Sequence, residues 1–175
     1  AIDTMRLLID PEQIDTGRNQ RCIKINVNNS KIFKLSDRTR NKEGRNIDYA
    51  AVDEIHEMKD NTIIKSIEQS QSLKDNPKLI MITTEGFVND GALDELLRDA
   101  RKTINGENDD VASERFLPWL YTQDSEQEIW QDERTWEKSN PSLGIVKKWD
   151  YLRTQIAQAK KSTADRIFVL SKDFN

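Results

Sequence analysis

Two short apolar runs limit what this chain can fold into more than any other feature of its sequence. Residues 48–54 read DYAAVDE and residues 77–86 read PKLIMITTEG, and neither run shows the regular polar alternation of a half-exposed strand. Between them, residues 61–73 (NTIIKSIEQSQSL) repeat their apolar side chains at helical spacing. Two buried strands joined by a helix predict a parallel sheet covered by helices, so the expected fold class is α/β.

The remaining patterns add elements on both sides of this unit. Asn28, Asn29 and Ser30 separate two alternating runs, which is typical of a β-hairpin. The other expectations are a helix at 2–9, a surface loop at 37–46, a helix at 90–106, a possible strand at 116–121, an amphipathic helix at 128–144 that stops at a Ser-Asn-Pro turn, and a final helix at 149–161.

Composition narrows the possible functions. The chain has 175 residues, enough for one domain with a core, and its net charge of -4 gives no global basic excess of the kind that marks nucleic-acid binding. A single cysteine excludes an internal disulfide and a cysteine-cluster metal site. No apolar run reaches membrane-spanning length, so we expect a cytoplasmic protein without membrane contact. The start lacks a methionine and lies inside a helical pattern, so we expect a piece of a longer protein.

Asp53 and Glu54 follow the first apolar run, at the end of a strand where parallel sheets gather their ligands. An apolar strand that ends in Asp-Glu is the Walker B arrangement. Its Asp holds a Mg²⁺ that bridges nucleotide phosphates, and the next carboxylate orients the attacking water. Thr83 and Thr84 end the second run, where their hydroxyls can sense a γ-phosphate or hold that water. These four residues predict a nucleotide-hydrolysing site.

A plainer interpretation of the carboxylates stays open. Apolar runs followed by Asp-Glu are common where a strand meets a helix, and there the carboxylate only caps the helix. His56 and Glu57 begin like the zinc-binding H-E-x-x-H, but the chain has one histidine, so we exclude that site and treat His56 as a polar neighbour. We assign the four tryptophans to packing.

Longer segments carry a resemblance to a known family. DYAAVDEIHEMKDN at 48–61, SIEQSQSLKDNPKLIMITTEGFVNDGALD at 66–94 and WEKSNPSLG at 136–144 resemble the ATPase domain of the phage terminase large subunit. The likeness spans most of residues 22–175 in the same order. Terminases package double-stranded viral DNA into capsids, using an N-terminal P-loop ATPase for translocation and a C-terminal nuclease for cutting. The resemblance therefore implies a P-loop NTPase-like, RecA-type, mainly parallel sheet flanked by helices.

The resemblance also implies roles for individual residues. Asp53 becomes the metal-binding Asp and Glu54 the catalytic Glu that activates water. The coupling motif that links hydrolysis to motion corresponds to Thr83, Thr84 and Gly86, with His56 and Glu85 as possible accessory residues. By the same resemblance, Glu85 stands where many relatives carry a small residue. The implied cofactors of the full-length protein are Mg²⁺ and ATP. Its implied partners are double-stranded DNA, the small terminase subunit, the portal protein and other copies in a ring, in an infected or lysogenic bacterial host.

One departure from the family pattern changes what we expect of this chain. It contains no G-x-x-x-x-G-K-S/T, the loop that cradles the β and γ phosphates. We therefore expect residues 1–175 to be the C-terminal portion of the ATPase domain, with a sheet that lacks the P-loop strand. Alone, it should neither bind ATP tightly nor hydrolyse it. The edge of LIMITT at 79–84 would be bare, so the piece could self-associate. The alternative function is a non-catalytic module that contacts the portal, the small subunit or neighbouring subunits.

Overall fold

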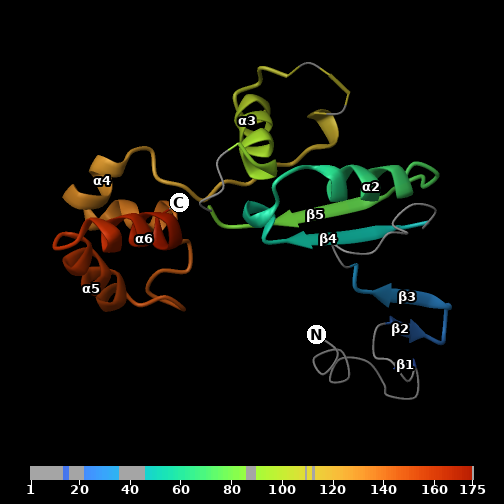
Figure 1. The fold of residues 1–175 in the computed structure, drawn as a ribbon, viewed down its shortest axis with the longest axis horizontal. Helices are drawn as coiled ribbons and strands as arrows, with labels where there is room; N and C mark the ends of the chain where they lie inside the picture. Colours follow the sequence, from blue (N-terminus) through green and yellow to red (C-terminus); the bar gives the residue numbers. More distant parts are fainter. Residues whose placement is uncertain are drawn as a thin grey trace. The chain divides into compact units, whose positions relative to one another are not determined.

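The computed structural model describes residues 14–15, 22–35, 46–85, 90–108, 110–111 and 113–174 (Figure 1). The chain divides into two compact units, residues 1–45 and residues 46–175. The expected opening helix at 2–9 and nearly all of the expected loop at 37–46 lie outside the described residues.

The first unit contains a small antiparallel sheet of β1 (Ile14–Asp15), β2 (Cys22–Ile25) and β3 (Ser30–Phe33), in that order. The β2–β3 hairpin confirms the sequence prediction, with Cys22 opposite Phe33. Its turn includes Asn29 in the left-handed region at φ 57°, a conformation that asparagine tolerates well. The short strand β1 was not predicted.

The second unit begins with the predicted strand–helix–strand arrangement. The strands β4 (Tyr49–Asp53) and β5 (Lys78–Ile82) pair in parallel, and the 3-10 helix η2 (Ile55–Glu57) and the helix α2 (Thr62–Ser70) connect them (Figure 1). The parallel pairing confirms the prediction. The helix α2 is shorter than predicted, because the chain leaves it at Gln71, whose side-chain amide donates to the Lys78 carbonyl at 2.9 Å. Leu73, which the pattern placed on the helix, is exposed.

Burial on the two faces of this sheet is unequal. Ala50 and Val52 are buried on one face, and α2 contributes the buried Ile64 and Ile67. On the other face Tyr49, Ala51, Ile80 and Ile82 are exposed. The prediction that these strands are buried on both faces is therefore wrong for the described structure, in which only one side of the sheet is covered. Among the described residues, β4 and β5 pair only with each other, so in this part of the chain the outer edge of β5 is unpaired.

The helix α3 (Ala92–Ile104) follows, as predicted. The carboxylate of Asp94 accepts a hydrogen bond from the amide of Gly91 at 3.2 Å, which caps the N-terminus, and Gly106 follows the helix in the left-handed region at φ 69°. The 3-10 helix η3 (Ser113–Arg115) comes next. The possible strand at 116–121 does not form, and Trp119 is exposed rather than packed.

The last third of the second unit is a cluster of helices, α4 (Glu126–Gln131), η4 (Glu133–Lys138), α5 (Trp149–Ala159) and α6 (Thr163–Asp173) (Figure 1). The single helix expected at 128–144 is interrupted at Asp132, whose carboxylate accepts from the Arg134 amide at 3.0 Å and so starts a new helical segment. The helix predicted at 149–161 corresponds to α5, whereas α6, the last helix of the chain, was not predicted. The buried residues of this cluster are Ile129, Trp136, Leu143, Leu152, Ile156, Ala159, Val169 and Phe174.

Trp136 lies inside this cluster, and Trp130 and Trp149 pack against it, so the predicted packing role holds for three of the four tryptophans. The Trp136 indole donates to the Ile129 carbonyl at 2.9 Å, which satisfies its only polar group. None of the helices in the described ranges has the length and apolar character of a membrane span.

Candidate functional site

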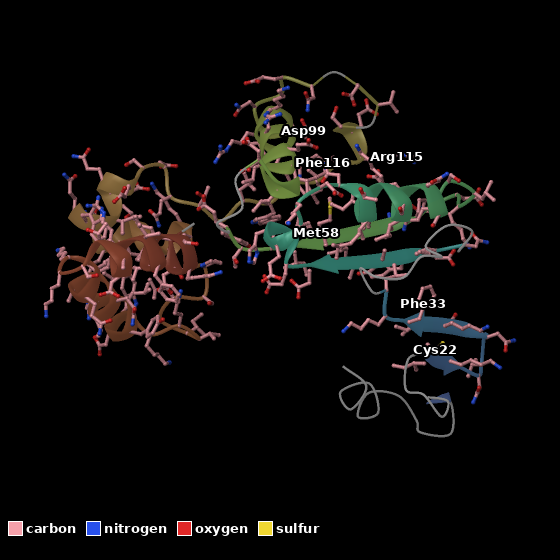
Figure 2. The ribbon with its side chains drawn as sticks, viewed as in Figure 1. Cys22, Phe33, Met58, Asp99, Arg115 and Phe116 are labelled. Carbon is pink, nitrogen blue, oxygen red and sulfur yellow. The ribbon has the colours of Figure 1, made fainter. Side chains whose placement is uncertain are left out.

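The parallel register brings the carboxyl ends of β4 and β5 together. Asp53 lies opposite Ile82, and the next amide along the chain, that of Glu54, donates to the Ile82 carbonyl at 3.1 Å. Thr83 and Thr84 follow Ile82 directly. The two predicted carboxylates and the two predicted hydroxyl residues are therefore neighbours at one edge of the sheet. Met58, which Figure 2 labels, marks the place where the chain leaves η2, and its carbonyl accepts from the first amide of α3 at 3.2 Å.

Glu54 adopts a conformation that is rare for a residue with a side chain. Its φ of 56° and ψ of 44° lie in the left-handed region, which costs about 1–2 kcal/mol outside glycine. The bond to Ile82 and a second bond from its amide to Asp53 Oδ1 at 2.9 Å hold it there. Although Glu54 occupies the position before η2, its side chain makes no capping hydrogen bond. The geometry thus does not support the helix-cap interpretation for this carboxylate.

His56 links the two strand ends. Its ring Nδ1 lies 3.1 Å from Glu54 Oε2 and 3.1 Å from Thr83 Oγ1. Its backbone amide also donates to Thr83 Oγ1 at 3.1 Å. The imidazole is only 10% exposed, whereas the Glu54 side chain is 59% exposed. Sequence reasoning treated His56 as a neighbour of the site. In the structure, His56 lies between Glu54 and Thr83. The only sequence signal for this placement was its position three residues after Asp53.

The other expected residues join this site to different degrees. Thr83 Oγ1 donates to the carbonyl of Thr84 at 2.9 Å, so Thr84 takes part through its backbone. The side chains of Thr84 and Glu85 are exposed. Gly86 lies outside the described residues.

The carboxylates at this edge fit a magnesium ion of the kind that nucleotides bring with them. Asp53 uses Oδ1 to accept from the Glu54 amide, and its side chain is exposed. Within the described ranges no three His, Cys, Asp or Glu side chains gather to hold a metal. Mg²⁺ in nucleotide sites needs only one or two carboxylates, since water and phosphate oxygens supply the other ligands. The donors at the strand end are therefore of the right chemistry for Mg²⁺ with a bound phosphate.

Residues 3–102 match the protein family described as "Terminase large subunit, ATPase domain". This match covers more than half of the chain and includes Asp53, Glu54 and the two threonines. The chain therefore belongs to the terminase large-subunit ATPase domain family.

Two known proteins are similar to the chain. The Escherichia coli (strain K12) protein described as "Protein YmfN" is 27% identical over 113 residues, which are 65% of this chain and 24% of YmfN. The crystal structure of the HK97 bacteriophage large terminase matches 93% of this chain with a TM-score of 0.75, at 18% sequence identity. That match covers 33% of the HK97 chain. The likeness shows that the two proteins share a fold, and the chain spans a quarter to a third of the length of these relatives.

Proposed function

We propose that the chain is part of an ATP-hydrolysing motor that translocates double-stranded viral DNA into a capsid, and that it carries the Walker B and coupling motifs of that motor. The observation that carries this proposal is the meeting of Glu54 and Thr83 at His56, at the carboxyl ends of two parallel strands. Family membership supports the motor class, since the family is the ATPase domain of the terminase large subunit.

In this proposal Asp53 holds Mg²⁺ and Glu54 is the general base that activates the attacking water. Thr83, Thr84 and Gly86 form the coupling motif, because the Thr83 hydroxyl, which lies beside the His56 ring that also contacts Glu54, can respond to the γ-phosphate. The bound ion would supply charge neutralisation for the phosphates. The exposure of the Glu54 side chain supports its role, since a general base must reach a water molecule.

The wider setting follows from the same proposal. Residues 1–175 are the C-terminal portion of the ATPase domain, and the phosphate-cradling loop comes from a segment upstream. The partners of the full-length protein are double-stranded DNA, the small terminase subunit, the portal protein and further large-subunit copies in a ring. It acts in the cytoplasm of a bacterial host.

A non-catalytic binding module is the second candidate. The exposed apolar face at Tyr49, Ile80 and Ile82 favours it, as does the edge of β5, which pairs with no further strand in the described part of the chain, since such surfaces bind other chains. The same surfaces fit the motor proposal equally well if an upstream strand covers them. Catalysis therefore has to be measured to separate the two candidates.

The test measures Mg²⁺-dependent ATP hydrolysis by this chain and by a version extended upstream through a G-x-x-x-x-G-K-S/T segment. We expect hydrolysis only by the extended protein, with Glu54→Gln lowering kcat by about 10²–10⁴-fold, as for loss of a general base. Glu57→Gln is the matched control, because Glu57 is an exposed carboxylate three residues further along the same turn. It should leave kcat unchanged.

Two results would count against the proposal. Full activity of Glu54→Gln in the extended protein would remove this carboxylate from the mechanism. No hydrolysis in the folded extended protein would favour the binding module.

A further inference from the structure

The imidazole of His56 contacts both strand ends through a single nitrogen. Nδ1 is within hydrogen-bonding distance of Glu54 Oε2 and of Thr83 Oγ1, at 3.1 Å in each case. At 10% exposure the ring is nearly buried, so water competes little for its nitrogen Nδ1. Nothing else in the described site joins the carboxylate to the threonine side chain.

The available protons determine which atom donates in the contacts between His56, Glu54 and Thr83. Thr83 has one hydroxyl proton, and it goes to the Thr84 carbonyl at 2.9 Å. Its oxygen can then only accept, and it already accepts from the His56 amide. An ionised Glu54 can also only accept. With Thr83 Oγ1 and Glu54 Oε2 both accepting, a hydrogen bond from the ring to either of them requires a proton on Nδ1.

We infer that His56 is a positioning residue, protonated on Nδ1, that ties the Glu54 carboxylate to the Thr83 hydroxyl and so fixes the direction of the base from the neighbouring strand. The catalytic part of this inference rests on the proposed function of Glu54. Without the tie, an exposed glutamate on a left-handed backbone samples several rotamers, only some of which point at a bound water. With it, the orientation of the carboxylate depends on where the end of β5 lies.

The same contacts make the tie sensitive to movement. Hydrogen bonds fail beyond about 3.5 Å, so a shift of Thr83 by only about half an ångström away from the ring would weaken its bond to Nδ1.

The competing explanation is that the His56 ring has a purely structural role. The backbone amide of His56 already holds Thr83, so the ring is not needed to keep the two strand ends together.

The first experiment reads the ring directly and needs no enzyme activity. The chain has one histidine, so two-bond ¹H–¹⁵N correlations of imidazole nitrogens report His56 alone. At a pH where the ring is neutral, we expect the Nδ1-protonated pattern, although free histidine in water favours Nε2. Glu54→Ala and Thr83→Val each remove one acceptor and should lower the Nδ1-protonated fraction, whereas Glu57→Ala should not. An Nε2-protonated ring in the unmodified chain would overturn the inference.

The second experiment measures the consequence for catalysis in the upstream-extended protein. His56→Ala should lower kcat for ATP hydrolysis by about 10–100-fold, as loss of an orienting partner does, with KM changed by less than about threefold. His56→Asn should recover most of the loss, because its amide nitrogen can donate from near the place of Nδ1. Loss of stability with kcat intact, or no recovery by His56→Asn when that variant folds normally, would mean that the ring is structural.

The two experiments fail separately. If the motor proposal is wrong, the extended protein does not hydrolyse ATP, yet the ring still shows its Nδ1 proton. If His56 does not link Glu54 to Thr83, the ring does not show its Nδ1 proton, while Glu54→Gln still lowers kcat for ATP hydrolysis by about 10²–10⁴-fold.

Discussion

Replacing Lys147 with methionine is expected to destabilise the helical cluster more than replacing its partner Asp173 with asparagine. Lys147 Nζ lies 2.6 Å from Asp173 Oδ1. The Asp173 side chain is 5% exposed and the Lys147 side chain is 27% exposed. The pair also holds the Ser-Asn-Pro turn. Lys147 Nζ lies 2.7 Å from Asn140 Oδ1, and the side-chain amide of Asn140 donates to the Asp173 carbonyl at 2.7 Å.

Each substitution leaves one charge behind, and its cost depends on how much water that charge can regain. Lys147→Met leaves a carboxylate that is almost fully buried, and its Oδ2 already has no hydrogen-bond partner among the described residues. Breaking a buried pair in this way costs about 3–5 kcal/mol. Asp173→Asn leaves an amine that reaches solvent and keeps its bond to Asn140, so we expect a loss of about 1–2 kcal/mol.

Urea unfolding followed by tryptophan fluorescence measures these losses, because Trp136 and Trp149 lie in or against the same cluster. The double variant leaves no charge behind and should be more stable than Lys147→Met alone. Lys161→Met, at an exposed position of the same cluster, is the control and should stay within about 0.5 kcal/mol of the unmodified chain. Equal losses in the two single variants, or strictly additive losses in the double variant, would refute the reasoning.

Three further changes test other parts of the cluster. Gly144→Ala should cost about 1 kcal/mol or more, because Gly144 has a φ of +86° and a Cβ would lie 3.1 Å from Trp149 Nε1; an unchanged thermal midpoint would contradict this. Ser162→Ala removes the hydroxyl that caps α6 and should cost about 1 kcal/mol in urea unfolding, with Ser162→Asn as the control that restores a cap. The hydrogen bond from Lys138 lowers the pKa of Glu128, so their contribution to stability is present above about pH 4.5 and is lost as the pH falls through the lowered pKa. Lys138→Met should therefore make the unfolding midpoint fall less steeply as the pH is lowered. An unchanged dependence of the midpoint on pH would show that the Lys138–Glu128 pair does not stabilise the fold.

The sequence was sufficient to predict the part of the fold that depends on short-range patterns. An apolar run, a helical repeat and a second apolar run lead directly to β4, α2 and β5, and their parallel pairing follows from the connection between them. Once the strands are parallel, Asp53 and Thr83 must end at the same edge. That step needs only the order of the elements, so the neighbourhood of the candidate site could be predicted.

Other features depend on contacts that a single sequence does not display. The helix α6 was missed because Ile167 and Phe168 are exposed on it while Asp173 is buried, which blurs its apolar period. The break at Asp132 arises from one side-chain hydrogen bond, in a segment whose apolar spacing continues across it. Helical periodicity alone cannot distinguish a continuous helix from two segments whose apolar faces remain in phase.

The link through His56 between Glu54 and Thr83 depends on the register of β4 against β5. This register is the feature of the site that the sequence indicates least. A slip of one residue between β4 and β5 would turn the Thr83 side chain to the opposite face of the sheet and away from His56. Gln71, which is buried, limits such a slip from the far end of β5, because its side-chain amide donates to the Lys78 carbonyl at 2.9 Å. The amide of Lys78 in turn donates to the Asp48 carbonyl at 2.9 Å and sets the first rung of the ladder. A glutamine outside the site therefore helps to determine whether the histidine inside it can reach both strand ends, and no local motif around Asp53 carries that information.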